Sequence, residues 1–260
     1  MMKVVVTGGS GFVGSSLRSY TDWLFPTRHE LDLLHKESID IYFSNIKPNV
    51  VVHLATQYNS LNNTQLNLNI MQACERFSVS KIILVSPPEI FPNSYMINAT
   101  ETILDKIPIE IGNEGCIPMR RLLDLQRHFL VNTKYICLFP TNLFGSNDNN
   151  LNHIIPSLRN SLPKIYDHAK SQRQFLYIED FSNIIYECVH YEPKSRGEFF
   201  ICAPDEKITM EKVANILTDK NVEYIPTKPR YRNVFSNKKL LETFPTLTFS
   251  NFEDTFLRVF

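Results

Sequence analysis

The sequence predicts an α/β fold, with a doubly wound parallel sheet and a smaller α/β domain at the carboxyl edge of that sheet. Two observations carry this prediction. Short apolar runs recur along the first 140 residues, as expected of strands buried on both faces of a parallel sheet. Segments with apolar residues at helical spacing separate these runs, and such βαβα alternation is typical of parallel sheets.

The expected strands of the first part are Lys3–Val6, Trp23–Phe25, Val50–Leu54, Lys81–Val85 and Tyr135–Phe139. The expected helices between them are Phe12–Tyr20, Ser38–Asn45 with Ser38 as N-cap, Asn62–Phe77 and Cys116–Val131. After Pro140 the units become smaller. There we expect helices at His153–Asn160, Glu179–His190 and Met210–Leu217, and strands at Gln174–Ile178, Phe199–Cys202 and Val222–Ile225.

A glycine-rich turn follows the first expected strand and opens the first helix. It reads Thr7-Gly8-Gly9-Ser10-Gly11-Phe12-Val13-Gly14. Gly8 allows a tight turn, Gly11 lets the backbone approach a pyrophosphate, and Gly14 lets the helix lie close to the strand. The N–H groups and the dipole of a helix N-terminus favour an anion. This order of strand, turn and helix predicts a dinucleotide site; the alternative is an ordinary glycine-rich turn.

The residues after the second expected strand bear on the choice of dinucleotide. In dinucleotide-binding folds this strand commonly ends in an acid that binds the ribose hydroxyls. Here the strand is followed by Pro26-Thr27-Arg28, which contains no acid. A cation at this place can pair with a 2′-phosphate, so Arg28 favours NADP(H), and the Thr27 hydroxyl can add a donor. Asp32 keeps NAD as the alternative, and Arg28 can also be a solvated surface residue.

Composition excludes several classes of function. The chain of 260 residues has 27 basic and 27 acidic side chains, so nothing favours general binding to nucleic acids or membranes. No apolar run approaches the roughly 20 residues of a membrane span, and a strand at the very start predicts no signal peptide. The five cysteines lack CxxC spacing, which indicates reduced thiols in the cytoplasm and no structural metal; they are Cys74, Cys116, Cys137, Cys188 and Cys202.

Segments spread along the chain match one family pattern. They are the glycine turn through Ser15, Thr27–Leu34, Lys47–Ala55, Asn69, Phe139–Asn149, His153–Pro156 and Arg173–Asp180. On these segments the chain resembles the extended short-chain dehydrogenase/reductases, and within that group the GDP-L-fucose synthases. The resemblance implies a Rossmann-like fold and an NADP(H)-dependent epimerase or reductase. It further implies a GDP- or dTDP-linked deoxysugar substrate and a homodimer formed through a four-helix bundle.

The resemblance also implies roles for particular residues. Asn142, Asn147 and Arg173 would contact the substrate, Arg173 as a clamp on the diphosphate. His153 would act as acid and base in epimerisation, although a surface histidine is the alternative. The cofactor would contact Gly8, Gly11, Phe12, Val13, Gly14, Arg28, Leu54, Ala55, Pro140 and Leu143.

The chain departs from the family at the hydride step. The family uses a Tyr-x-x-x-Lys motif and a serine on the preceding strand. Here Cys116 takes the tyrosine position, Arg120 the lysine position and Pro87 the serine position, with Ser86 one residue away. Arginine stays charged, so it can hold ribose hydroxyls but cannot readily relay a proton. A free thiol titrates near 8.5, and lower beside a cation such as Arg120, but it is a weak hydrogen-bond donor. The alternative is that Cys116 is a small buried residue.

Two classes of function remain open. The chain is either a nucleotide-sugar oxidoreductase or epimerase whose protons are handled by His153, Cys116 or a bound water, or a catalytically inactive partner or regulatory subunit that binds the same ligands. A third reading is thiol chemistry at Cys116, which requires an oriented base. We expect residues 1–140 plus about 172–192 to form the dinucleotide-binding domain. Residues 141–171 plus about 193–260 would form the substrate domain.

Overall fold

The computed structural model describes residues 2–19, 21–57, 60–91, 100–102, 117–146, 148, 155, 164–165, 169–218, 222–225 and 234–259, and in residues 60, 89 and 117–121 only the backbone. Its strands are β1 (Val4–Thr7), β2 (Val50–His53), β3 (Lys81–Val85), β4 (Lys134–Pro140), β5 (Asn142–Phe144), β6 (Lys164–Ile165), β7 (Gln172–Arg173), β8 (Phe175–Tyr177), β9 (Gly197–Cys202), β10 (Ile208–Thr209) and β11 (Glu223–Tyr224). Its helices are α1 (Phe12–Arg18), α2 (Lys36–Ile46), α3 (Ser60–Arg76), α4 (Ile117–Phe129), α6 (Ile178–His190), α7 (Met210–Leu217), α8 (Lys238–Thr243) and α9 (Phe252–Val259), with a 3₁₀ turn at Pro88–Ile90.

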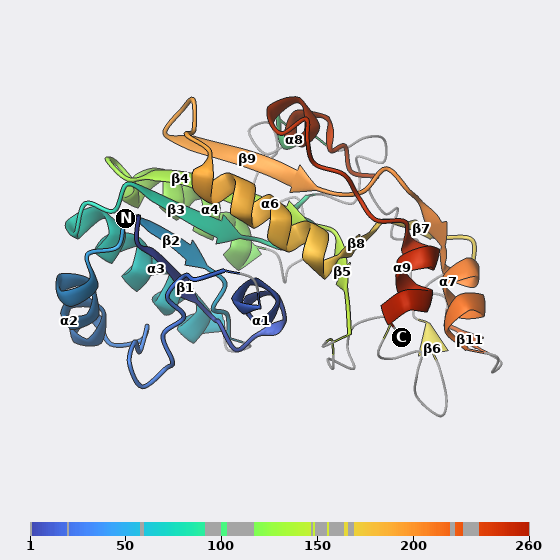
Figure 1. The fold of residues 1–260 in the computed structure, drawn as a ribbon, viewed down its shortest axis with the longest axis horizontal. Coiled ribbons are helices and arrows are strands. Elements are labelled where there is room, and N and C mark those ends of the chain that lie inside the picture. Colours follow the sequence, from blue (N-terminus) through green and yellow to red (C-terminus); the bar gives the residue numbers. More distant parts are fainter. Residues whose placement is uncertain are drawn as a thin grey trace.

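A parallel sheet of five strands, in the order β1-β2-β3-β4-β9, forms the centre of the described structure (Figure 1). The strands start in step, with Val4 opposite Val50, Val50 opposite Lys81, and Lys81 opposite Lys134. Their carboxyl ends therefore meet at one edge. This confirms the predicted α/β class with its parallel central sheet.

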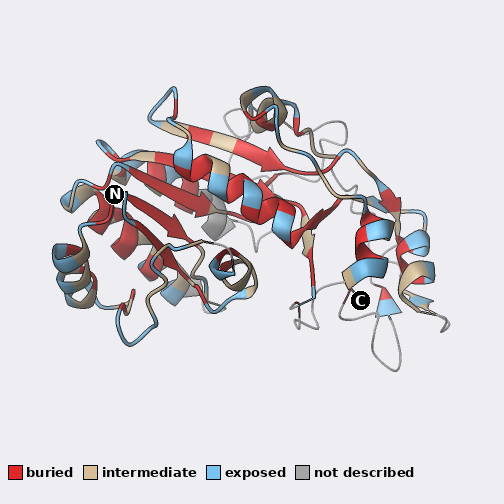
Figure 2. Cartoon of the chain, in the orientation of Figure 1, coloured by how far each residue is buried: buried red, intermediate tan, exposed pale blue. Residues whose placement is uncertain are grey.

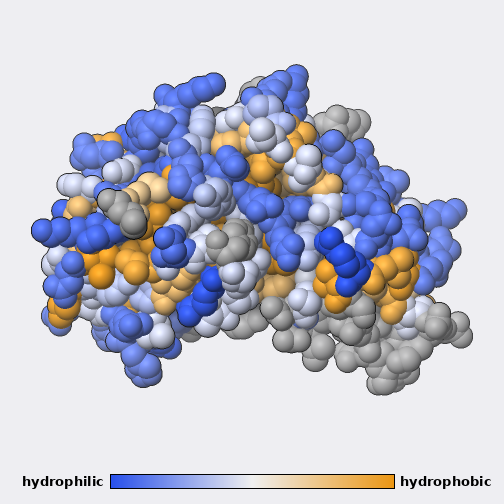
Figure 3. Space-filling model, in the orientation of Figure 1, coloured by the Kyte–Doolittle hydropathy of each residue, from blue (hydrophilic) through white to orange (hydrophobic). Residues whose placement is uncertain are grey.

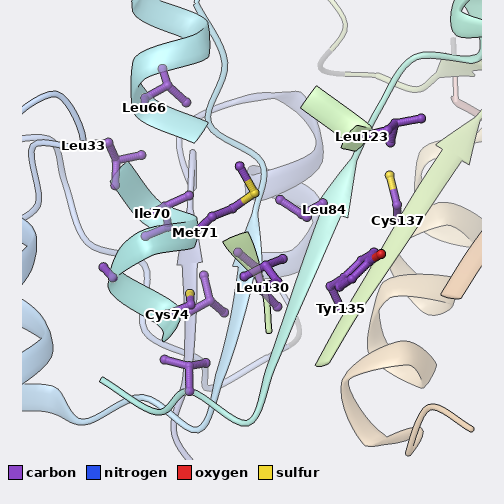
Figure 4. Close-up of a cluster of buried hydrophobic side chains, with 14 of the residues drawn as sticks. Leu33, Leu66, Ile70, Met71, Cys74, Leu84, Leu123, Leu130, Tyr135 and Cys137 are labelled. Atoms are coloured by element: carbon purple, nitrogen blue, oxygen red, sulfur yellow. The ribbon is translucent and has the colours of Figure 1, made fainter. Parts of the chain in front are cut away.

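Helices cover both faces of the sheet because successive strand residues point to opposite sides. On one face Val5, Val51 and Ile82 pack with residues of α2, α3 and α4 in a buried cluster, part of which Figure 4 shows. On the other face Val6, Val52 and Ile83 pack against α6 and Leu17 of α1. The strands thus have no solvated face, which explains their continuous apolar runs.

A third hydrophobic cluster lies beyond the carboxyl edge, in the smaller part of the molecule (Figures 1 and 2). Phe144 of β5, Phe175 of β8 and Phe252 of α9 meet there, with ring centroids 5.0 Å apart for the pairs Phe144–Phe252 and Phe175–Phe252. Met210 and Val213 of α7 also belong to it. This cluster gives the insertions of the second half a core of their own.

Two local predictions were wrong. The expected strand Trp23–Phe25 is reduced to an isolated bridge between Leu24 and Val5. Pro26 has no N–H to extend a ladder, and the carbonyl of Phe25 accepts a hydrogen bond from Arg18 instead. Ser38 does not cap α2: the helix starts earlier, with His35 at the N-cap, and the Ser38 hydroxyl accepts the N–H of Asp32.

Strand β9 belongs to the central sheet, although the predicted boundary near residue 193 places it in the second domain. It lies beside β4 and is the last strand of the described sheet. Two side chains bond its outer edge. The carboxylate of Glu101 accepts the N–H of Ile201 at 2.9 Å, and the amine of Lys239 donates to the carbonyl of Phe199 at 2.8 Å.

The surface is of mixed character. The face shown in Figure 3 is mostly hydrophilic, with smaller hydrophobic patches between the polar side chains. Within the described ranges, none of the helices combines the length and the apolar character that a membrane span requires.

Candidate functional site

A cavity of about 660 Å³ opens at the carboxyl edge of the sheet. This is where ligands bind in doubly wound α/β folds. All of the predicted cofactor-binding residues except Arg28 line it: Gly8, Gly11, Phe12, Val13, Gly14, Leu54, Ala55, Pro140 and Leu143. Two of the predicted substrate-binding residues, Asn142 and Arg173, line it as well. The structure therefore brings both sets to one site.

The glycine turn forms one wall of this cavity, and its backbone requires glycine at two positions. Gly8 has a φ of +74°, and a Cβ on it would lie 2.6 Å from the N atom of Ala55. A Cβ on Gly14 would lie 2.4 Å from the carbonyl oxygen of Gly8. Gly11 is the N-cap of α1 and has no side chain to bond the first N–H groups of the helix, and the first turn carries no acid. The turn thus has the form of an anion site.

His53, at the end of β2, also lines the cavity, and sequence analysis missed it. Its Nδ1 atom lies 2.8 Å from the hydroxyl of Thr7, and among the described residues its Nε2 atom has no well-formed hydrogen bond. The pKa of His53 is lowered to about 4, chiefly because the ring is buried. An interaction with the Asn67 side chain opposes this shift but is the smaller effect. The imidazole is therefore neutral near pH 7. The signal in the sequence that could have identified His53 is its place directly after the run of valines Val50–Val52.

A second polar group lies between β3, β4 and α4. Ser86 and Gln126 line the cavity and are both buried, and no described residue bonds the Oε1 atom of Gln126. The Cys137 thiol lies beside them; burial raises its pKa to about 12, and hydrogen bonds with Ser86 and Gln126 oppose that rise. Gln126 was not predicted as a site residue, because the family pattern marks other positions of this helix.

Arg28 lies outside the cavity. Its side chain is 71% exposed, and its Nε atom lies 3.5 Å from the carboxylate of Asp32. The Asp32 pKa is lowered chiefly by the hydrogen bond from the Leu34 N–H, and also by Arg28. Thr27 has its N–H and its hydroxyl bonded to Glu30, at 2.7 and 2.8 Å, so its hydroxyl proton is already used.

On the opposite wall, the Asn142 amide donates to the carbonyl of Gln174 at 2.8 Å. Gln174 in turn bonds Pro204 and Phe235, which fixes the loops beside Arg173. The remaining predictions lie outside the described part: Cys116, Asn147 and His153 entirely, and Arg120 in its side chain. Pro87, at the predicted serine position, does line the cavity.

The parallel sheet, the glycine turn and the cavity at the carboxyl edge define a protein with a Rossmann-like dinucleotide-binding fold. Residues 4–201 match the NAD dependent epimerase/dehydratase family, and the chain belongs to that family. This confirms the resemblance to extended short-chain dehydrogenase/reductases.

Individual proteins to which the chain is similar also point to this family. The chain is 31% identical over 292 residues to a GDP-L-fucose synthase of Dictyostelium discoideum, an alignment that covers 95% of this chain and 90% of that protein. A GDP-L-fucose synthetase structure from Naegleria fowleri bound to NADP has a TM-score of 0.84 at 22% identity, covering 98% of this chain and 91% of that one. A Thermus thermophilus UDP-glucose 4-epimerase complex with NAD has a TM-score of 0.75 at 19% identity, covering 98% and 96%. The two structures show the shared fold.

Proposed function

We propose that the chain binds NADP(H) and a nucleotide-linked deoxysugar, and that it acts as an oxidoreductase or epimerase with a non-standard proton path. One observation carries this proposal: a single cavity of about 660 Å³ joins the glycine turn to Asn142 and Arg173. Ligand pockets for small molecules fall in this range of volume. The cavity has an anion cradle on one wall and a guanidinium on the other.

The chain's residues fit a nicotinamide dinucleotide. A Cβ on Gly11 would meet only the Gly8 carbonyl, at 3.2 Å, so the absence of a side chain there leaves room for a pyrophosphate. Pro140 and Leu143 give the cavity an apolar wall where a nicotinamide ring can lie. The cofactor supplies hydride when bound. A relative's structure is bound to NADP, and this supports NADP(H) here, as Arg28 does; NAD is the alternative.

The substrate side fits a nucleotide sugar. Arg173 lies in β7 and lines the cavity, and its planar fork suits a diphosphate. Asn142 is held by Gln174, so its position is fixed before a ligand enters. We assign Asn147 to the same subsite from its place in the motif. The names of two relatives, a GDP-L-fucose synthase and a GDP-L-colitose synthase, support a GDP-linked sugar.

Proton handling is where the chain departs from its relatives. A ketone that receives hydride also needs a proton, and Pro87 at the cavity wall has no donor. The candidates are His153 and Cys116, with Arg120 holding ribose hydroxyls and a bound water as a further source. Loss of one general acid typically costs 10²–10⁴-fold, which slows such a reaction without abolishing it.

The test is turnover. The protein is incubated with NADPH and with GDP- or dTDP-linked 4-keto-6-deoxy sugars, and loss of nicotinamide absorbance is followed. We expect slow turnover that survives Cys116→Ser and is lost in His153→Ala. Absence of NADPH binding contradicts the whole proposal.

The second candidate is a catalytically inactive binding partner or regulatory subunit. The observation that favours it is Pro87, which lines the cavity in place of a hydroxyl donor, together with Cys116 and Arg120. Tight NADPH binding without turnover on any of these sugars would establish this candidate and exclude the enzyme. We also propose a homodimer and a cytoplasmic location; the four described cysteines are all free and buried, which suits a reducing compartment.

A further inference from the structure

Arg28, which was predicted to contact the cofactor, lies outside the cavity, beyond the segment in which Leu24 bridges Val5. The cavity lining includes residues of β2, β3 and β4 and of the glycine turn after β1, together with residues of α3, α4, β5, β7 and β8. A pyrophosphate on that turn separates the two halves of the ligand. An adenosine bound on the side of β1 away from β2 would lie beside the segment in which Leu24 bridges Val5 and which continues to Arg28.

Arg18 is fixed at this place, and neither the motif pattern nor the cavity identified it. Its guanidinium carbon lies 5.0 Å from the centroid of the Phe25 ring, and one of its nitrogens donates to the Phe25 carbonyl at 3.3 Å. That nitrogen, Nη2, is only 3.0 Å from where a Cβ on Gly9 would be. The cation is thus held against the outer side of the glycine turn.

The nearby acids are engaged elsewhere. Glu30 bonds the N–H and hydroxyl of Thr27, and Asp32 pairs with Arg28. Arg18 is near enough to Glu30 to help lower its pKa, behind the hydrogen bonds from Thr27. Within the described part of the chain, no carboxylate lies at ion-pair distance from Arg18. Its remaining N–H groups are available to a ligand.

We propose that Arg18, together with Arg28, binds the 2′-phosphate of NADP(H) and so determines the preference over NAD(H); this rests on the proposed function. A phosphate monoester carries a charge between −1 and −2 near neutral pH, and a planar guanidinium can bond two of its oxygens at once. Stacking on Phe25 orients the fork before the ligand binds. NAD(H) has a hydroxyl at this position and gains little from the cation.

The experiment compares dissociation constants for NADPH and NADH, measured by nicotinamide fluorescence, in the wild type, Arg18→Ala, Arg18→Lys and Arg28→Ala. Arg76→Ala is the matched control, because Arg76 is also exposed and lies over a phenyl ring, that of Phe77, but on α3. We expect Arg18→Ala to weaken NADPH binding about tenfold or more and to change NADH binding by less than about twofold. Arg18→Lys should recover part of the loss, since it keeps the charge but not the fork. Arg76→Ala should bind both nucleotides as the wild type does.

Two results would overturn the inference. One is unchanged NADPH binding in Arg18→Ala. The other is an equal loss for NADPH and NADH, which would mean that Arg18 only supports the glycine turn; thermal unfolding of each variant checks that reading. A wild type that binds neither nucleotide would contradict the proposed function itself, and the inference with it.

Discussion

The Nδ1 atom of His53 lies 2.8 Å from the Oγ1 atom of Thr7, so a side-chain contact ties the carboxyl end of β2 to that of β1. Thr7 also lies 3.4 Å from the N–H of Ala55, the residue that a Cβ on Gly8 would strike. The contact therefore fixes the base of the glycine turn against the next strand. Both side chains are buried, and the tautomer of His53 decides which of the two atoms donates.

The first prediction concerns acid stability. Burial lowers the pKa of His53 to about 4, against an ordinary value near 6.5. The unfolded chain therefore takes up this proton at a higher pH than the folded protein does. We expect the His53 contribution to lower the free energy of unfolding by up to about 3 kcal/mol as the pH falls from about 6.5 to 4. Urea unfolding across this range measures it, and a His53→Asn variant with the same pH dependence would contradict it.

The second prediction separates folding from cofactor binding at the glycine turn. Gly11 has a φ of −77°, which alanine adopts freely, and a Cβ there meets only the Gly8 carbonyl. Gly11→Ala should change the free energy of unfolding by less than about 1 kcal/mol but weaken NADPH binding at least about tenfold. Gly14→Ala should lower the free energy of unfolding by at least about 1–3 kcal/mol, because its Cβ would lie 2.4 Å from the Gly8 oxygen. Unimpaired NADPH binding by Gly11→Ala would refute the pyrophosphate cradle.

The third prediction concerns a buried lysine far from the cavity. The amine of Lys81, at the start of β3, donates to the carbonyl of Val189 at 2.8 Å and to that of Tyr191, and so caps the end of α6. Lys81→Met should lower the free energy of unfolding by about 2–4 kcal/mol, since it leaves two carbonyls unbonded. Lys3→Met is the control, because the exposed Lys3 caps α2 in the same way through Ile46. There water can replace the amine, and a loss below about 1 kcal/mol is expected. Equal losses in urea unfolding would show that burial does not matter here.

The fourth prediction compares two buried glutamines. Gln126 has an Oε1 atom without a partner in the described structure, whereas Gln174 bonds Pro204 and Phe235 through both ends of its amide. In the ligand-free protein, Gln126→Met should leave the free energy of unfolding unchanged or raise it by up to about 1 kcal/mol. Gln174→Met should lower it by about 2–4 kcal/mol. A large loss in Gln126→Met would mean that its amide is satisfied by an ordered water.

Much of the fold could be predicted from the sequence, because strands that are buried on both faces appear as continuous apolar runs. Lys81–Val85 and Met210–Leu217 were predicted with the bounds that the structure shows. The helices α8 and α9 were missed. The N-terminal signal of α9 is the side chain of Asn251, which accepts the N–H of Asp254. Its apolar face is short and consists of Phe252, Phe256 and the partly buried Val259.

The candidate site was predictable where a motif fixes the backbone and less so where side chains from distant segments meet. The glycine turn and Pro140–Leu143 line one cavity as expected. Gln126 and Arg18 lie in or beside the site because of tertiary packing, whereas the run of valines before His53 was a signal in the sequence. Arg18, for instance, is held beside the glycine turn by the ring and the carbonyl of Phe25, and no spacing rule predicts these contacts.

The outer edge of β9, the last strand of the described sheet, affects whether two molecules can associate through their sheets. A strand edge usually offers a row of N–H and carbonyl groups on which a foreign strand can form a ladder. On β9 the N–H of Ile201 already donates to the carboxylate of Glu101, and the carbonyl of Phe199 already accepts a hydrogen bond from the amine of Lys239. An incoming strand would have to displace both charged groups to gain two ordinary backbone bonds. At these two positions the sheet is closed to templated growth, and so to the edge-to-edge association that begins aggregation.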